Sequence, residues 1–252
     1  MAYTIKEIEE MNKVYRECLN ADWTKLDFNM TDKYKKLPKP NVCKVYDEGE
    51  VFELDKDKIK LSRKNLHDII MGRRSIRQYD DVKMSKKELS YLLKLTSSIV
   101  KSGPGYAFGV VPTGGATNTL ETYIYLNKVE GFEKGLYHYM KDTGNIRLIR
   151  DDITDEMVNE SIHNQLRDCA VVFYWTTTPY RAEYKYQYVS HKMIAIEAGH
   201  ACQNLYLAAE SIDYGVVAIA AYKQKEADKL LQINPKEEFV IYCATVGKKI
   251  KK

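Results

Sequence analysis

Apolar residues recur at helical spacing in several separate stretches of the chain. This pattern predicts helices over residues 1–20, 62–72, 157–166, 191–209 and 225–232, and a further helix that begins after Ser85. Ser62 and Ser85 are residues of the type that cap helices, and Glu88 stands three positions after Ser85, where it completes a capping box. We therefore expect caps at both serines.

Short runs of β-branched and aromatic residues separate these helices. They predict strands over residues 122–129, 136–140, 146–150, 169–177, 214–222 and 238–247. Residues 103–109 are rich in glycine and are expected to form a loop. Strands and helices alternate after residue 60 without a linker, which indicates one α+β or α/β domain over residues 61–252. Residues 1–60 are expected to form a helix and an extended arm that lies over a neighbour.

The stretch before the longest predicted helix has a different rhythm. Charged residues and tyrosines alternate over residues 183–188, so an extended chain would point Lys185 and Tyr186 in opposite directions. The helix that follows has an apolar face, which predicts a core or dimer-interface helix; it comprises Ile194, Ala198, Ala201, Leu205 and Ala208. His200 lies among small residues there and is expected to be a hydrogen-bonded histidine of the core.

Composition narrows the classes of partner. The net charge is +4 and the lysines are scattered, apart from the final "GKKIKK", so the sequence does not predict nucleic-acid binding and favours a small anion such as a phosphate. No run of 18 apolar residues occurs, which argues against a membrane span. The five cysteines form no Cys-x-x-Cys pair, so we expect neither a zinc site nor a disulfide framework. Free thiols are typical of a reducing compartment, so we expect a cytoplasmic location.

Common nucleotide and hydrolase motifs do not fit the chain. "GPGYAFG" has the wrong spacing for a dinucleotide fingerprint, "PTGGATNT" lacks the lysine of a P-loop, and no Gly-x-Ser-x-Gly occurs. The histidines are never at metal-ligand spacing with a carboxylate, so no metal site is predicted. "GRRSIR" places Arg73, Arg74, Ser75 and Arg77 at a helix end, where they could bind phosphate or could simply complement the helix dipole.

Five stretches together resemble the FMN-dependent nitroreductase superfamily, and within it the SagB-type branch. They are "RRSIRQY", "PTGGATNTLETYIYLNKVEGFEKGLYHY", "KYQYVSHKMIAIEAGHACQNLYLAAE", "YGVVAIAAY" and "YCATVG", and they cover about residues 60–250. The resemblance implies an α+β nitroreductase-like fold with a central mixed sheet flanked by helices, an intertwined homodimer, and FMN held between the subunits.

The resemblance also assigns residues to the flavin. Arg73 and Ser75 are expected to hold its phosphate and ribityl chain, Arg74 to support them, and Arg77 to reach the pyrimidine edge. Positive charge at that edge stabilises reduced flavin. The other expected contacts are Pro112, Thr113 and Gly114 of the partner subunit, backbone groups of Ile219 and Ala220, and the charge of Lys248 or Lys249. Ala220 stands where the family often has glycine, which matters only if φ is positive there.

Two residues are expected to act on the substrate. In azoline-oxidising members of the branch, a Lys-Tyr pair at this distance before the "AGH" helix is catalytic, which points to Lys185 and Tyr186. Lysine can serve as the base only if burial or cationic neighbours lower its pKa. The alternative is that both residues lie on a solvated face. Thr117-Asn118-Thr119 departs from the branch's pattern, which puts the usual substrate pocket in question.

Three functions remain open at this stage. The first is hydride transfer between NAD(P)H, FMN and a small organic or peptidic substrate. The second is oxidation of azolines to azoles in a modified peptide, for which the Lys-Tyr pair is the marker. The third is a non-catalytic flavin-binding scaffold.

Overall fold

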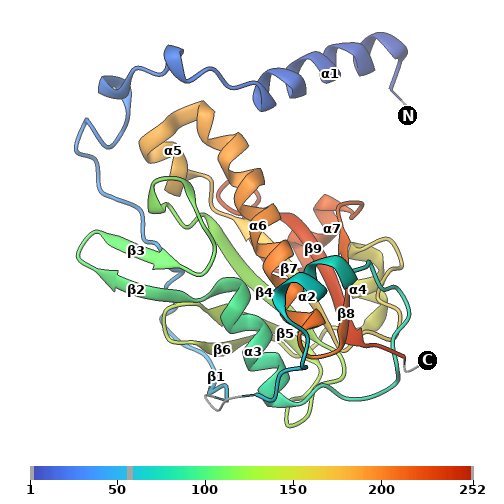
Figure 1. Cartoon of the computed structure of the whole chain (residues 1–252). Helices are drawn as coiled ribbons and strands as arrows, with labels where there is room; N and C mark the ends of the chain where they lie inside the picture. Colours follow the sequence, from blue (N-terminus) through green and yellow to red (C-terminus); the bar gives the residue numbers. More distant parts are fainter. Residues whose placement is uncertain (1–2, 56–58, 251–252) are drawn as a thin grey trace.

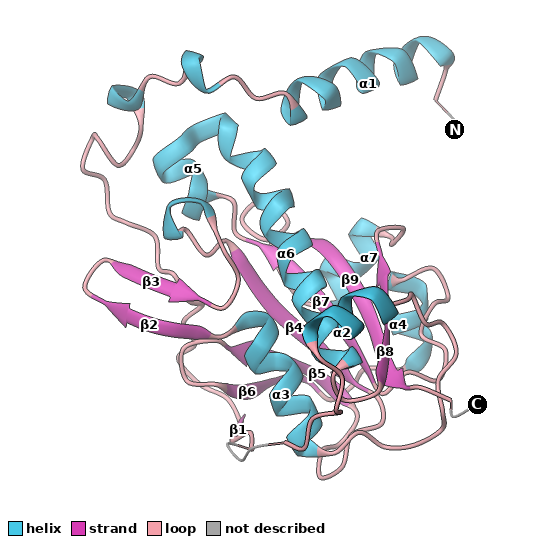
Figure 2. Ribbon diagram, in the orientation of Figure 1, coloured by secondary structure: helices cyan, strands magenta, loops and turns pink. Residues whose placement is uncertain are grey.

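A computed structural model describes residues 3–55 and 59–250. Its centre is a seven-stranded sheet with helices on both faces, and a two-stranded hairpin projects from one side (Figures 1 and 2). The strands are β1 Val51–Phe52, β2 Ile99–Gly103, β3 Tyr106–Gly109, β4 Leu120–Leu126, β5 Gly135–Met140, β6 Asn145–Arg150, β7 Val171–Thr177, β8 Tyr214–Ile219 and β9 Phe239–Lys248. The helices are α1 Ile5–Leu19, α2 Leu66–Gly72, α3 Lys86–Ser97, α4 Asp155–Ser161, α5 Tyr180–Tyr186, α6 Ser190–Glu210 and α7 Gln224–Leu230.

The order of strands in the large sheet is β1-β6-β5-β4-β7-β9-β8. Each pairing between these strands is antiparallel. A parallel bridge between Ser75 and Val216 adds the segment after α2 to the free edge of β8, and this makes the sheet mixed. The expected α+β fold with a mixed sheet flanked by helices is confirmed.

Both faces of the sheet are covered, which explains why its central strand β7 is a nearly continuous apolar run. Helices α3 and α6 pack on one face, where Leu92 and Leu205 meet Ile124 and Phe173 of the strands. Helices α4 and α7 cover the other face through residues such as Val158 and Leu230. A strand buried on both faces has no solvated side, so it reads as a continuous apolar run. This is the pattern of the central strand β7.

The helix caps agree with the sequence prediction in one case and differ in the other. Ser85 caps α3, and Glu88 completes the capping box. Helix α2 begins at Leu66 and is capped by Asn65, whose side chain accepts from the backbone N–H of Asp68, so the cap predicted at Ser62 is wrong. The backbone N–H of Ser62 instead donates to the carbonyl of Ser211, 2.8 Å away, which holds this residue against the end of α6.

Two predicted segments adopt other structures. Residues 99–109 form the β2–β3 hairpin, and the Gly-rich stretch expected to be a loop contains its turn: Gly103 pairs with Tyr106, and Gly105 has φ +79°. Proline followed by a glycine of positive φ is the pattern of a tight type II turn. Residues 180–186 form helix α5 instead of the extended chain that the alternation suggested.

The N-terminal arm touches the body in more than one place. Helix α1 buries none of its side chains, although part of it lies near α6. Further along, the backbone N–H of Lys33 donates to the carbonyl of Tyr184, and β1 pairs with β6. The division into an arm of residues 1–60 and a domain of residues 61–252 stays a prediction, and residues near Lys44 and Leu54 already pack on the sheet.

Candidate functional site

A basic turn follows α2 at the edge of the sheet. The Arg73 guanidinium lies over the ring of Tyr206 of α6, with its central carbon 5.0 Å from the ring centre. The hydroxyls of Ser75 and Tyr206 are 3.0 Å apart and share a hydrogen bond. The backbone N–H of Ala218 in β8 also donates to the Tyr206 hydroxyl, at 2.9 Å. Tyr206 therefore joins the predicted phosphate-binding residues to β8, a role that sequence reasoning missed.

The other two arginines of the motif have different environments. Arg74 donates to the carbonyls of Met71 and Arg73, both at 2.8 Å, so it caps the last turn of α2, as the alternative explanation of the motif proposed. Arg77 is exposed. Across residues 3–55 and 59–250, neither Arg73 nor Arg77 forms an ion pair with a carboxylate. Both charges are thus available to an anion.

The two C-terminal lysines are each near an acidic group. Lys249 forms an ion pair with Glu210, whose carboxylate also accepts from Lys64 at 2.9 Å and lies close to Gly72. Lys248 lies 3.7 Å from Glu88. Although burial opposes charge on Glu210, its two lysine partners lower its pKa, so it stays ionised. Glu210 therefore brings Lys249 close to the basic turn.

The backbone at the end of β8 is unstrained at the position where the resemblance expects glycine. Ile219 pairs with Cys243 of β9, and Ala220 follows the strand as an exposed residue. Ala220 is not among the residues of positive φ, so an alanine at this position is unstrained. The alanine that replaces the family's glycine is therefore compatible with the backbone contact expected there.

The loop over residues 112–119 is held by α6. Glu197 is 5% exposed and accepts from the hydroxyls of Thr113, at 2.8 Å, and Thr119, at 2.9 Å. Burial raises the pKa of Glu197, and the two hydroxyls oppose that shift. His200 lies with its Nδ1 3.3 Å from the Pro112 carbonyl oxygen, and it is exposed, so its prediction as a core histidine is wrong. Sequence reasoning did not identify Glu197.

Lys185 and Tyr186 converge on the same loop. Lys185 Nζ donates to the carbonyl of Gly115 at 2.6 Å, and the Tyr186 hydroxyl lies so close to Gly115 that a Cβ there would stand 2.0 Å from it. Burial lowers the pKa of Lys185, and the charges of Lys39 and Lys33 lower it further. The structure thus brings the predicted Lys-Tyr pair to the loop that begins with Pro112, Thr113 and Gly114.

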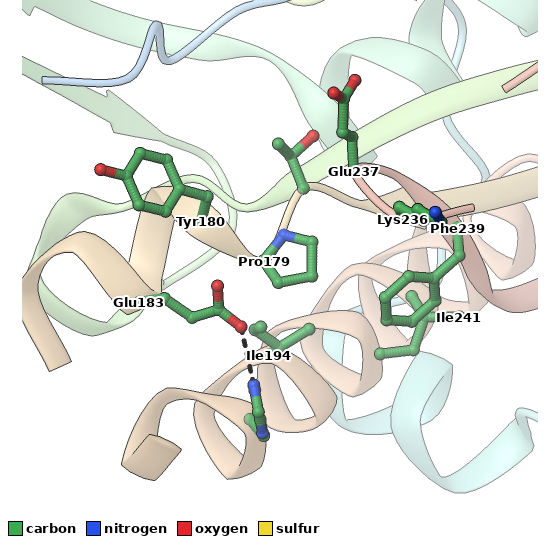
Figure 3. A pocket seen from close by; sticks show the side chains of 10 residues that line it. Pro179, Tyr180, Glu183, Ile194, Lys236, Glu237, Phe239 and Ile241 are labelled. Carbon is green, nitrogen blue, oxygen red and sulfur yellow. Dashed lines mark hydrogen bonds and ion pairs between the residues drawn. The ribbon is translucent and has the colours of Figure 1, made fainter. Parts of the chain in front are cut away.

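A cavity of about 790 Å³ opens beside the start of α6 (Figure 3). Its apolar walls are Pro179, Ile194, Phe239 and Ile241, and its polar lining is Thr178, Tyr180, Glu183, His191, Lys236 and Glu237. In Figure 3 the carboxylate of Glu183 points to the imidazole of His191, and the two are joined at 2.8 Å. Neither residue of this pair was identified from the sequence.

Helix α6 relates these parts to one another. Twelve residues separate Ile194, at the cavity, from Tyr206, at the basic turn, a rise of about 18 Å. Ile241 of the cavity lies two residues from Cys243, the partner of Ile219, so cavity and basic turn lie along β8 and β9. Glu197, which holds the loop, is nine residues from Tyr206 and therefore on the opposite side of the helix, at about 100° per residue. One chain presents two groups of predicted flavin contacts on two sides of α6.

Comparison with known proteins places this α+β fold in a known family. Residues 70–248 match the Nitroreductase family. The chain belongs to this family of oxidoreductases, whose members bind FMN. A candidate nitroreductase of Methanocaldococcus jannaschii is 28% identical over 207 residues, which is 80% of this chain and 99% of the relative.

Solved structures show the same fold. A candidate nitroreductase of Anabaena variabilis has a TM-score of 0.62 and 28% identity over 73% of this chain, which spans 38% of that protein. The Escherichia coli microcin synthetase McbBCD complex with truncated pro-MccB17 has a TM-score of 0.61 and 16% identity over 99% of this chain and 96% of that one. A candidate nitroreductase of Exiguobacterium sibiricum in complex with FMN has a TM-score of 0.53 and 14% identity over 75% and 90%.

The described residues offer neither a membrane-spanning helix nor a cluster of metal ligands. Over residues 3–55 and 59–250, no helix combines the length and apolar character needed to cross a membrane. Within the same ranges, His, Cys, Asp and Glu side chains form no group of three or more that could hold a metal ion.

Proposed function

We propose that the protein is an FMN-dependent oxidoreductase that transfers hydride between NAD(P)H and a small organic or peptidic substrate. The observation that carries the proposal is the basic turn, where Arg73 lies over Tyr206 beside the Ser75 hydroxyl and has no carboxylate partner in the described part of the chain. A permanent cation next to a hydroxyl suits a phosphate group. Family membership supplies the oxidoreductase class.

The residues along β8 fit the remaining parts of an FMN molecule. Arg73 and Ser75 would hold the phosphate and ribityl chain, with Arg74 supporting the turn, and Lys248 or Lys249 would add a second positive charge. Arg77, exposed and without a carboxylate partner among the described residues, would stabilise negative charge at the pyrimidine edge. Ile219 and Ala220 would offer backbone groups to the ring. When bound, FMN supplies the hydride chemistry, and the protein binds, orients and shields it.

The site is proposed to be completed by a second copy of the chain. Thr113 is held by Glu197, on the opposite side of α6 from Tyr206, so its loop lies on a different side of the helix from the basic turn of its own chain. An exposed stripe of α6 that includes the small residues Ala195 and Gly199 would let another backbone approach closely. A homodimer in which each loop covers the other chain's flavin uses both sides of the helix.

The flavin-binding role is tested by removing the two central contacts. In Arg73→Ala/Ser75→Ala, the affinity for FMN is expected to fall about a hundredfold or more, because two hydrogen bonds to a charged group are lost. Equilibrium dialysis followed by absorbance of the bound flavin measures this. Arg16→Ala, on helix α1, removes an exposed arginine that is not among the proposed flavin contacts, and it should leave affinity unchanged. A colourless wild-type protein that cannot be reconstituted with FMN would overturn the proposal.

The electron donor and the scaffold alternative are tested together. Anaerobic mixing of the FMN-loaded protein with NADH or NADPH should bleach the flavin absorbance, and the faster nucleotide is the donor. If the flavin is bound but neither the nucleotides nor any substrate reduces it, the non-catalytic scaffold is the better explanation.

A second candidate function is the SagB-type oxidation of an azoline to an azole in a peptide. It is favoured by Lys185, whose pKa is lowered by burial and by Lys39 and Lys33, as a base for the substrate's proton requires. Tyr186 would orient the proton transfer through its hydroxyl. The likeness in fold to a synthetase complex solved with a truncated precursor peptide suggests the class of substrate.

This second candidate has its own test. Azoline-containing peptide incubated with the FMN-loaded protein should lose two hydrogens by mass spectrometry, and Lys185→Ala should abolish that loss. If no azole forms and Lys185→Ala leaves NAD(P)H-dependent nitro reduction unchanged, the azoline role is rejected and general hydride transfer remains.

A further inference from the structure

The cavity beside α6 combines apolar walls with one paired acid and base. Pro179, Ile194 and Phe239 surround its interior, and the Glu183 carboxylate meets His191 Nε2 at 2.8 Å (Figure 3). The His191 side chain is 50% exposed and that of Glu183 is 35% exposed, so a molecule in the cavity can reach the imidazole. Such walls suit a flat aromatic compound, and the imidazole suits an oxygen acceptor on it.

The other titratable groups that line the cavity are less suited to exchange a proton there. The Tyr180 hydroxyl donates to Asp32 at 3.0 Å, outside the cavity. Lys236 and Glu237 are exposed on the loop before β9, and the Glu237 carboxylate points away from Ile194 and Phe239 (Figure 3). Lys185, two residues after Glu183 on α5, donates to Gly115 and does not line the cavity.

We propose that this cavity binds a neutral aromatic acceptor, a quinone, and that His191 gives the acceptor its proton. Glu183 is the positioning residue, because its carboxylate accepts from His191 Nε2 at 2.8 Å and so orients the ring. The proposal rests on the proposed function, since Ile241 of the cavity lies two residues along β9 from Cys243, which pairs with Ile219, a residue assigned to the flavin ring.

In the proposed reaction a quinone bound in the cavity is converted to a hydroquinone. The quinone gains two electrons and one proton as hydride, which NAD(P)H supplies by way of the flavin. Its second proton comes from His191: the imidazolium N–H bond breaks and an O–H bond forms on the substrate. Water then reprotonates the imidazole, so the net reaction is quinone, NAD(P)H and a proton giving hydroquinone and NAD(P)⁺.

Reduction of the flavin by NAD(P)H tests the proposed function, and its reoxidation by a quinone tests the role of His191. In stopped-flow mixing of the FMN-loaded protein, reduction by NAD(P)H should be the same in wild type, His191→Gln and Glu183→Gln. Reoxidation by 1,4-naphthoquinone should slow about a hundredfold in His191→Gln, because the proton donor is lost.

Matched variants exclude a merely structural effect. His163→Asn changes another exposed histidine, one with positive φ that asparagine accepts, and should leave both half-reactions unchanged. His191→Ala should recover part of its reoxidation rate when imidazole is added to the buffer, which a misfolded variant would not do. Unchanged reoxidation in His191→Gln would overturn the inference while leaving the proposed function intact. Failure of wild type to bind FMN, or to be reduced, would overturn both.

Binding without turnover gives a second readout. Titration of the oxidised FMN-loaded protein with 2-naphthol, followed by calorimetry, should show one site per chain. Phe239→Ala should weaken this binding about tenfold, since it removes an aromatic wall of the cavity. Equal affinity in wild type and Phe239→Ala would place the aromatic compound elsewhere and reject the cavity.

Discussion

Glu121 is a charged residue in the interior of the protein, and it contacts the N-terminal arm through Lys44. Its side chain is 1% exposed and meets Arg181 at 2.6 Å, His138 at 3.1 Å and Lys141 at 3.4 Å, and it accepts from the backbone N–H of Lys44. A buried carboxylate with this many partners contributes little net stability as a group, but loss of any one member leaves the others uncompensated.

Glu121→Gln is expected to reduce the free energy of unfolding by about 3–5 kcal/mol, because Arg181 and Lys141 would remain buried without a counter-charge. Chemical denaturation at pH 7 measures the change. The control is Glu160→Gln, which breaks an exposed ion pair to Lys223 with a length of 3.4 Å and should cost at most about 1 kcal/mol. Equal effects of the two substitutions would contradict this account of the interior.

The same carboxyl predicts a pH dependence. Burial opposes its charge, but Lys141, Arg181 and His138 together hold its pKa far below the ordinary value. Since the pKa is lower in the folded protein, the stabilisation is complete above the unfolded value of about 4.3 and is lost as the pH falls below it. Wild type should therefore lose stability between about pH 5 and pH 3 more steeply than Glu121→Gln does. Parallel curves would show that another group governs acid unfolding.

Gly115 tests the contact between the loop and the Lys-Tyr pair. It has φ +60°, and an added Cβ would stand 2.0 Å from the Tyr186 hydroxyl oxygen. Gly115→Ala should cost about 1–2 kcal/mol for the backbone conformation alone and more for the contact. Gly131→Ala is the control, because Gly131 has φ +75° but open space around it. If Gly115→Ala and Gly131→Ala lose the same stability in thermal unfolding, the Tyr186 hydroxyl does not contact the loop at Gly115.

At the scale of elements, α2 matters because it ends at Arg73. Asn65 caps this helix, so Asn65→Ala should reduce stability by about 1 kcal/mol and weaken FMN binding through fraying of the turn. Ser62→Ala is the matched comparison: its hydroxyl is buried and has no hydrogen-bond partner among the described residues, so its removal should be neutral or stabilising. Urea denaturation of both variants measures the difference. A larger loss of stability in Ser62→Ala than in Asn65→Ala would mean that Ser62, and not Asn65, caps α2.

Elements with strong local signals could be predicted from the sequence. The capping box of Ser85 and Glu88 and the apolar run of β7 depend on neighbouring residues only, and both were found. Helix α5 was missed because its alternating tyrosines follow a period of two, whereas its helical form is tied to tertiary contacts such as that of Tyr184 with the arm. The β2–β3 hairpin was missed because glycines mark both loops and tight turns.

Some residues of the candidate site could be predicted from local sequence, and others could not. Arg73 and Ser75 form a compact local motif, and the resemblance was sufficient to select them. Tyr206, Glu197 and Glu210 act through contacts with residues far away in the chain, as in the hydrogen bond between Ser75 and Tyr206. No local spacing signals a partner 131 residues distant, so only the folded arrangement identifies these residues.

At the scale of the whole molecule, α6 organises the proposed function. Its apolar face packs on the sheet, one side carries Tyr206 with the basic turn, and the opposite side carries Glu197 with the loop over residues 112–119. A single chain cannot direct both sides at one flavin, which is the physical reason to expect two active sites shared between two chains. Sedimentation at increasing protein concentration tests this, and FMN affinity should rise with the fraction of dimer.

The N-terminal helix gives the last prediction. Since α1 buries no side chain and an isolated helix of its length is marginal in water, deletion of residues 1–20 should change the unfolding free energy of the body by less than about 1 kcal/mol. Hydrogen exchange should find α1 weakly protected at low protein concentration, while the central strands stay protected. If α1 lies on a second copy, its protection rises with concentration, and the deletion weakens dimerisation instead. A loss of several kcal/mol at concentrations where the chain is monomeric would mean that α1 packs on its own body.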